Sequence, residues 1–355
     1  MIEVYANGKK FSNWLTASVN RSLDHIAATF SLSLQPTGGL ESFGMFPGDS
    51  VEIKCNGTKV LSGFVDKLSS SFSGGSHSVS VSGSEKTSDL ADCCLESPLE
   101  WAEKDISGIT GDICKAFGLS FSNSNGVEVG KPFKKFSADP GSKALETISK
   151  LCKERGILAC SDGIGNVSLV RPDSCQRGDY LEQGKNLLSA NADYSIVNRY
   201  STYLVYGSGK AKSKVKATAT DSEVERNRLI IIVDSNSTAK ENVQARADWE
   251  KCSRIAKSMS VKCEVHGWEC SSGIWSPGVI CSICAPAIGI NEMMDLLANS
   301  VTLSWSMESG EKTEISLVPP EVYAPQPESK KTKASKASKP GKADPWASIR
   351  KAVRG

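Results

Sequence analysis

Two stretches of the chain, FPGDSVEIKC (46–55) and WSPGVICSIC (275–284), share an order of features. In each, an aromatic residue and a Pro-Gly pair come before an apolar run with the length of a β-strand. Two strand-like runs within residues 18–34 precede the first stretch, and two within residues 190–206 precede the second. The strand-like runs that follow are 60–65, 78–81, 296–303 and 313–318. We therefore interpret the chain as carrying two copies of one small β-rich unit.

The first ninety residues have the turn and strand signals of a small barrel. Asn7-Gly8 and Asn56-Gly57 each lie between apolar runs, and both pairs tolerate the positive φ of a two-residue hairpin turn. Residues 29–34 and 78–82 alternate polar and apolar side chains, as half-buried strands do. Short strands with frequent turns favour a barrel or sandwich, and we predict a barrel.

The middle of the chain changes to helical patterns. Residues 106–117 predict a helix that Gly118 ends, and Asp139-Pro140 predicts the N-cap and first position of a second helix. The Gly-rich run 162–166 predicts a hairpin turn; as a phosphate loop it would need a following helix, a Lys and a Ser or Thr. Further along, Thr238 and Glu241 form a capping box for a helix that reaches about Met259.

The fold class that these patterns predict is α+β, mainly β. We expect two similar small β-barrels per chain, with an α+β module between them and a helical insertion in the second barrel. The predicted parts are 1–88 (first β-barrel), 89–182 (α+β module), 183–210 and 262–323 (second β-barrel), 211–261 (inserted helical arm), 324–344 (flexible basic linker) and 345–355 (C-terminal docking segment).

Charge divides the chain at its C-terminal tail. Residues 324–355 hold nine of the 42 Lys and Arg and two of the 40 Asp and Glu, which leaves 33 basic and 38 acidic side chains in 1–323, a charge of about −5. A folded body that binds nucleic acid needs an excess of basic side chains, so the charge of residues 1–323 disfavours a nucleic-acid-binding protein. The Lys run at 330–342 predicts a solvated linker, although it is also compatible with binding DNA or an anionic membrane.

The last residues and the N-terminus give two further expectations. Trp346, Ile349 and Val353 fall on one face of a short amphipathic helix and predict a docking segment. No apolar run approaches the roughly 18 residues that span a bilayer. The first residues show no secretory signal, so we expect folding in a cytoplasm, or export by another route.

Cysteine and histidine supply the candidate chemistry. Cys263, His266, Cys270, Cys281 and Cys284 have spacings that invite a zinc site. However, residues 261–266 and 279–284 have strand patterns, and in a strand residues three apart point to opposite faces. We favour reduced, buried thiols and predict no metal, no cofactor and no structural disulfide. The three His lie in no recognisable catalytic signature, so no catalytic residue is assigned.

Several motifs occur in an order that resembles the Mu-like phage baseplate hub family, also called the tail protein P family. The motifs at the end of the body are Gly267-Trp268, Trp275-Ser276-Pro277-Gly278, Asp295-Leu296-Leu297 and Leu317-Val318-Pro319-Pro320. Those at its start are Asn7-Gly8-Lys9 with Trp14, Pro47-Gly48-Asp49 and Leu61-Ser62-Gly63-Phe64. The resemblance covers about residues 1–323 and does not include the basic tail. The candidate interface and structural residues are Trp14, Pro47, Gly48, Asp49, Trp268, Trp275, Pro277, Gly278, Trp346, Ile349 and Val353.

The resemblance implies a structural protein without a catalytic site. Hubs of this kind carry two barrels per subunit, and three subunits close into a pseudo-sixfold ring between the tail tube and a membrane-piercing spike. The implied partners are two further copies of the chain, the spike, the tube protein or a tube-end adapter, and the baseplate wedge proteins. DNA would pass through the channel without specific binding, and no stable membrane insertion is expected.

The implied location is the tail baseplate of a virion, after assembly in the cytoplasm of a bacterial host. Two alternatives remain at this point. One is the hub of a tailocin or other contractile injection particle, and the other is a tail-associated cell-wall hydrolase.

Overall fold

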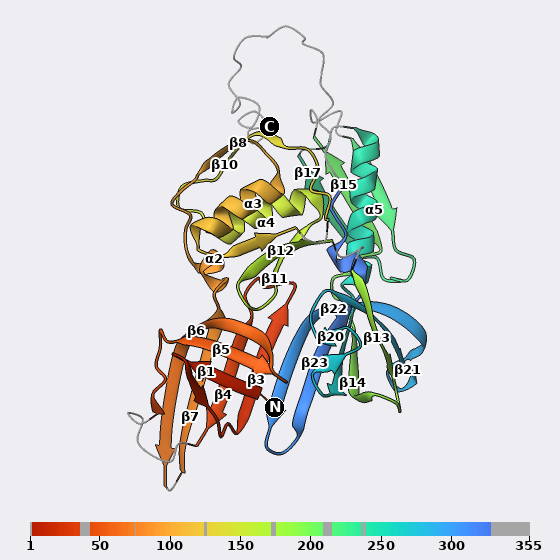
Figure 1. The fold of residues 1–355 in the computed structure, drawn as a ribbon. Helices are drawn as coiled ribbons and strands as arrows, with labels where there is room; N and C mark the ends of the chain where they lie inside the picture. The colour runs from red at the N-terminus through yellow and green to blue at the C-terminus, as the bar shows by residue number, and fades with distance from the viewer. Residues whose placement is uncertain are drawn as a thin grey trace.

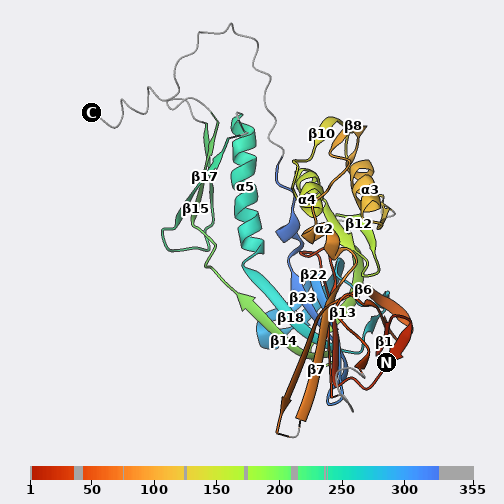
Figure 2. The same ribbon diagram turned by 90° about the vertical axis from the view of Figure 1, so that its left-hand side faces the viewer.

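The computed structural model describes residues 2–35, 43–74, 76–123, 126–171, 175–208, 215–235, 237 and 239–327. The chain is mainly β, with an α+β portion, as predicted. Two β units lie side by side, and the module and the arm both extend from the same end of them (Figures 1 and 2). No helix in the described part of the chain is both long and apolar enough to cross a membrane.

In its described residues, the first β unit contains seven strands. They are β1 (Ile2–Ala6), β2 (Lys9–Phe11), β3 (Thr16–Ser22), β4 (Thr29–Leu34), β5 (Ser50–Cys55), β6 (Thr58–Ser73) and β7 (Ser76–Glu85), in the sheet order β3-β4-β7-β6-β5-β1-β2. Both predicted Asn-Gly hairpins are confirmed. The φ angles are +48° and +77° at Asn7 and Gly8, and +49° and +79° at Asn56 and Gly57, which is the left-handed pair that this turn requires.

The second β unit is assembled from two separate parts of the chain. Its strands are β13 (Gln176–Glu182), β14 (Leu187–Tyr194), β18 (Met259–His266), β21 (Val279–Ala285), β22 (Ile290–Ser306) and β23 (Gly310–Val318). The order is β14-β18-β23-β22, with β21 on the first half of β22 and β13 on β21. Short elements complete it: β19 (Glu269–Cys270), β20 (Gly273–Ile274), η2 (Pro286–Ile288) and η3 (Pro320–Tyr323). Residues 176–182 were predicted in the α+β module, but as β13 they pair with β21 of the second unit.

The two units form one sheet, because β22 pairs with β3. Among the described residues the main strand path runs from β14 to β2 without closing, so two closed barrels are not confirmed. One buried apolar cluster spans both units, from Val4 and Ile53 to Val301 and Leu317. The alternating burial of β1 and β23 follows from the period of two along a strand, which directs every second side chain into this core.

The α+β module has a core of its own. It contains α2 (Ser88–Asp92), β8 (Glu100–Lys104), α3 (Ile106–Ala116), β9 (Ser120–Ser122), β10 (Phe133–Ser137), α4 (Ala144–Arg155), β11 (Leu158–Ser161) and β12 (Asn166–Val170). The predicted helix over 106–117 and the predicted hairpin around 162–166 are confirmed.

The predicted start of α4 at Asp139-Pro140 is wrong by four residues. The Asp139 carbonyl accepts hydrogen bonds from the amide and the hydroxyl of Ser142, so this segment forms a turn. Lys143 bridges to Cys94, and the amide of Ala144 donates to the carbonyl of Cys93. These tertiary contacts hold the chain away from helical geometry until Ala144.

The described part of the arm is a three-stranded sheet with one long helix. Its elements are β15 (Thr202–Gly207), β16 (Lys216–Thr220), β17 (Leu229–Asp234) and α5 (Lys240–Ala256). β15 was expected in the second barrel, but it pairs with β16 and β17 instead and lies between them. The arm therefore begins before β15. Thr238 of the predicted capping box lies outside the described residues, and Ala239 occupies the N-cap of α5.

Candidate functional site

The two Pro-Gly corners have the same geometry. Gly48 has φ +94° and Gly278 has φ +86°, values that a residue with a Cβ rarely adopts. The amide of Gly48 donates to the carbonyl of Val65, and the amide of Gly278 donates to the carbonyl of Ala298, both at 2.8 Å. Each corner therefore ties the start of one strand to the middle of the long strand beside it.

The long strands β6 and β22 also share an irregularity. The pairing of β6 with β7 shifts its register between Val65 and Lys67. The pairing of β22 with β23 shifts between Ala298 and Ser300. A β-bulge therefore follows the residue that accepts the corner hydrogen bond in both units.

The strand order repeats from one unit to the other. In the first unit the order is β3-β4-β7-β6-β5, and in the second it is β14-β18-β23-β22-β21, with every neighbouring pair antiparallel. The repeat that the Pro-Gly motifs suggested thus extends to five strands. The expected match of 190–206 to 18–34 is corrected, because β18 and not β15 is the second strand of the later copy.

A seam between the units is formed by β3 and the second half of β22. The register runs from Thr16 opposite Ser306 to Ser22 opposite Ser300. Across the seam, the Asn20 side chain donates to the Thr302 hydroxyl at 2.8 Å, and the amide of Leu23 donates to the carbonyl of Asn299 at 2.8 Å. Sequence reasoning missed these residues, since no local signal links positions about 280 residues apart.

The candidate tryptophans are internal. Trp14, Trp268 and Trp275 are all buried in the cluster that spans the units. The Trp268 indole nitrogen donates to the carbonyl of Ser304 at 2.8 Å, and the amide of Trp275 donates to the carbonyl of Trp268 at 2.9 Å. These contacts fit a role in the core rather than an exposed binding platform.

The remaining candidates divide into a described and an undescribed set. Asp49 stabilises the first corner, since its carboxylate accepts from the amide of Phe46 at 2.7 Å and its carbonyl accepts from the amide of Val65 at 2.9 Å. Pro47 and Pro277 precede the two corner glycines. Trp346, Ile349 and Val353 lie outside the described residues, so their docking role stays a prediction.

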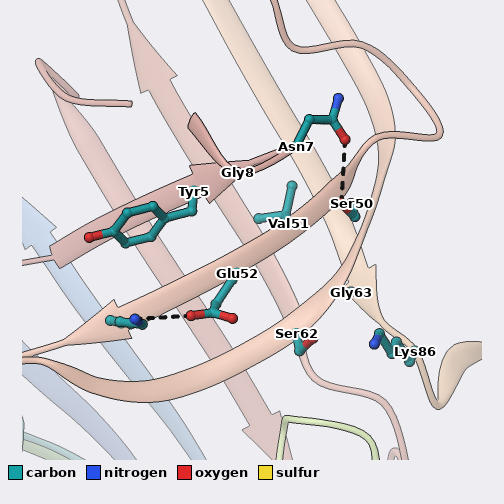
Figure 3. Close-up of a pocket in the computed structure, with 10 residues that line it drawn as sticks. Tyr5, Asn7, Gly8, Ser50, Val51, Glu52, Ser62, Gly63 and Lys86 are labelled. Carbon is teal, nitrogen blue, oxygen red and sulfur yellow. Dashed lines mark hydrogen bonds and ion pairs between the residues drawn. The ribbon is translucent and has the colours of Figure 1, made fainter. Parts of the chain in front are cut away.

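A shallow hollow of about 340 Å³ opens on the first unit (Figure 3). Its described lining includes Tyr5, Ser62 and Lys86 but no His or Cys. Glu52 is ion-paired with Lys54 and Lys59, which lowers the pKa of its carboxyl. The two lysines therefore hold the Glu52 carboxylate in its charged form at the edge of this hollow.

The cysteines of the zinc alternative do not converge. Cys263 and Cys281 are buried in the core, whereas Cys284 is partly exposed on its strand and His266 is exposed. In the described part of the chain, no three His, Cys, Asp or Glu side chains gather as metal ligands would. None of the twelve Cys, all of which lie in the described part of the chain, is joined in a disulfide.

Thiol titration tests this arrangement. Burial raises the pKa of six thiols to about 12; they are Cys55, Cys114, Cys152, Cys160, Cys263 and Cys281. Since the thiolate is the reactive form, we expect the exposed Cys93, Cys94 and Cys252 to react quickly at about pH 8 in the native protein. The buried thiols should react only after denaturation, when all twelve are reached. Markedly fewer than twelve in the denatured protein would contradict the prediction.

Three domain models from baseplate proteins match the chain. Residues 1–85 match the N-terminal domain of Mu phage baseplate assembly protein GpP-like, and 87–171 match the second domain of baseplate hub protein gp44-like. Residues 238–326 match the fourth domain of Mu phage baseplate assembly protein GpP. The first two ranges coincide closely with the first β unit and the module.

Relatives of known role or structure agree with these matches. The chain is 31% identical over 338 residues to the baseplate hub protein gp44 of Escherichia phage Mu, covering 91% of this chain and 88% of that protein. The 43 kDa tail protein of prophage MuSo2 from Shewanella oneidensis has a TM-score of 0.80 at 28% identity, covering 91% of this chain and 98% of that one. A tail protein from Neisseria meningitidis shares the fold, with a TM-score of 0.72 at 16% identity over 92% and 98%. The chain therefore belongs to the family of Mu-like phage baseplate hub proteins.

Proposed function

We propose that three copies of this hub chain close into a ring with pseudo-sixfold symmetry, which joins the tail tube to a central spike. The observation that carries the proposal is the repeated strand order of the two β units. Three chains with two similar units each present six near-equivalent surfaces, which is the number that a sixfold tube requires. One unit per chain would leave half of the tube's contacts unmet.

The two inserted parts distinguish the ends of such a ring. The module and the arm extend from the same end of the β units (Figure 2), so the two faces of the ring present different surfaces. Different faces suit different partners, namely the tube protein or its adapter on one face and the spike on the other, with wedge proteins around them. The ring assembles in the cytoplasm of the bacterial host. The same architecture serves an infectious tail and a tail-derived particle such as a tailocin.

The charge of the body fits a conduit for DNA. Residues 1–323 carry about −5, after the tail's nine basic and two acidic side chains are subtracted from 42 and 40. Basic walls would hold phosphates and retard their passage, because each neutralised phosphate releases counterions and adds affinity. We therefore assign the channel to passage of DNA without specific binding.

Native mass measurement tests the ring. We expect a mass near three times the 37.9 kDa of one chain. The two β units form one continuous sheet within the chain, so a single chain should be folded but have unpaired strand edges. A stable monomer at concentrations on the order of 10 μM would contradict the proposal. Denaturation with urea before the measurement gives the mass of the single chain as a control.

A further inference from the structure

We propose that β14 of one copy pairs, antiparallel, with residues 67–72 of β6 in the next copy, and that this pairing is the seam between subunits. The inference rests on the proposed ring and adds the edges and their register. Inside the chain, the edge strand of the first unit already pairs with the long strand of the second. The seam between subunits repeats that contact with the roles of the two units exchanged.

Equivalent positions follow from the printed pairings. The corner hydrogen bonds make Val65 equivalent to Ala298. Gly83 lies opposite Val65 and Leu317 lies opposite Ala298, so these two correspond. In the next strands Phe30 pairs with Gly83 and Val261 pairs with Leu317, so Phe30 corresponds to Val261. One strand further, Val19 pairs with Phe30 and Ala192 pairs with Val261. Val19 of β3 is therefore equivalent to Ala192 of β14.

The register of the β3–β22 seam within the chain, here called the inner seam, then predicts the register of the seam between subunits. Within the chain, Ser300 lies opposite Ser22 and Ser306 lies opposite Thr16. Beyond the bulges, β6 and β22 continue without another shift, so Lys67 corresponds to Ser300 and Ser73 to Ser306. The resulting pairs between copies are Leu68 with Tyr194, Ser69 with Asp193, Ser70 with Ala192, Ser71 with Asn191, and Phe72 with Ala190.

Both edges are available for this pairing. Among the described residues, β14 pairs with β18 and has one further bridge, from Leu187 to Gln183, while residues 67–72 of β6 pair only with β7. In the second unit the corresponding half of β22 has β23 on one side and β3 on the other. An unpaired edge of this length is a template for a strand from another chain. β7 and β14 lie toward opposite sides of the pair of units (Figure 1), as a head-to-tail contact requires.

Side chains at the two seams match in kind. The Phe72–Ala190 pair corresponds to Trp305–Ala17, an aromatic side chain opposite an alanine in both cases. Phe72 is 89% exposed and Tyr194 is 57% exposed, and the proposed seam covers both. The Ser69–Asp193 pair corresponds to Thr302–Asn20, which is joined by a side-chain hydrogen bond. Lys67 would lie diagonally across from Asp193, within reach of an ion pair.

Cysteine cross-linking tests the register. In a background with Cys93, Cys94 and Cys252 replaced by Ser, we introduce Ser71→Cys with Asn191→Cys, both at exposed positions. Directly opposed strand positions bring Cβ atoms close enough for a disulfide. Mild oxidation should give covalent dimers and trimers on a non-reducing denaturing gel, and reduction should return single chains.

Two matched variants complete the experiment. Ser18→Cys with Ser304→Cys places the equivalent pair inside one chain, so oxidation should leave its covalent mass unchanged. Ser71→Cys with Ala192→Cys is displaced by one residue, which directs the two thiols to opposite faces and should reduce the cross-linked fraction at least tenfold. If the protein is trimeric by mass but 71/191 does not cross-link, or if the displaced pair cross-links equally, the seam is overturned and the proposed ring stands. If the protein is monomeric, both are overturned.

Discussion

Replacing Glu85 by Ala is expected to lower the free energy of unfolding by about 3–5 kcal/mol, because it leaves two buried amides and one part-buried hydroxyl without an acceptor. Glu85 lies at the end of β7 and is fully buried. Its carboxylate accepts from the amides of Ala28 and Gly165, each at 3.0 Å, and from the hydroxyl of Ser161. These donors come from both the first β unit and the β11–β12 hairpin of the module. The side chain thus fixes the module on the β unit.

The contact around Glu85 explains why the loss should be large. The amide of Ser62 donates to the carbonyl of Gly163 at 2.9 Å, so the hairpin turn already rests on β6. A Cβ at Gly163 would approach the carbonyl of Val60 to 2.3 Å, so the turn and β6 are in close backbone contact. Urea denaturation followed by circular dichroism measures the change. A loss below about 1 kcal/mol would contradict the assignment of Glu85 as the tie between the two parts.

Glu85→Gln is the matched variant, and it separates charge from hydrogen bonding. Burial raises the pKa of Glu85 above its ordinary value of 4.5. Because the folded state then binds the proton more tightly than the unfolded state, this group's contribution to stability is present below pH 4.5 and declines as pH rises through the raised value. Gln keeps one acceptor oxygen and cannot titrate. We therefore expect a smaller loss of stability than with Ala, and no decline in that pH window from this position.

Local chemistry made part of the fold predictable. An Asn-Gly pair needs only its own two residues to adopt positive φ, so the hairpins at Asn7 and Asn56 follow from sequence. The Pro-Gly corners are similar, since Gly48 and Gly278 hold conformations that residues with a Cβ rarely adopt. These corners therefore mark the repeat of the two β units in the sequence itself.

The pairing partners of the strands could not be predicted in the same way. β15 has the alternation of any half-buried strand, and its sequence does not say whether its neighbour is in the second unit or in the arm. Its pairing with β17 is parallel and spans a connection of more than twenty residues. The β3–β22 seam joins residues about 280 positions apart. In the sequence Glu85 is only a polar residue at a strand end, and its role follows from its contacts with the module. Such contacts depend on the tertiary fold alone.

Trp268 connects the core of the second unit to the inner seam. It is 1% exposed and is the largest fully buried side chain among the described residues. Its indole nitrogen donates to the carbonyl of Ser304, a residue that lies opposite Ser18 of β3. The preceding residue, Gly267, donates its amide to the carbonyl of Glu311 and accepts from the hydroxyl of Thr313. Gly267 and Trp268 therefore support the half of β22 that pairs with the first unit.

Trp268→Ala should accordingly lower the free energy of unfolding by about 3–5 kcal/mol, the cost of removing a large buried aromatic side chain and leaving a cavity. Trp268→Phe keeps most of the apolar contact but loses the hydrogen bond to Ser304, and we expect a loss of about 1–2 kcal/mol. Trp249→Phe is the control, because the Trp249 side chain is part-buried in the arm and donates to the carbonyl of Ala324, away from the seam. Urea denaturation followed by circular dichroism compares the three variants. Equal losses for Trp268→Phe and Trp249→Phe would show that the hydrogen bond from Trp268 to Ser304 gives no particular support to the inner seam.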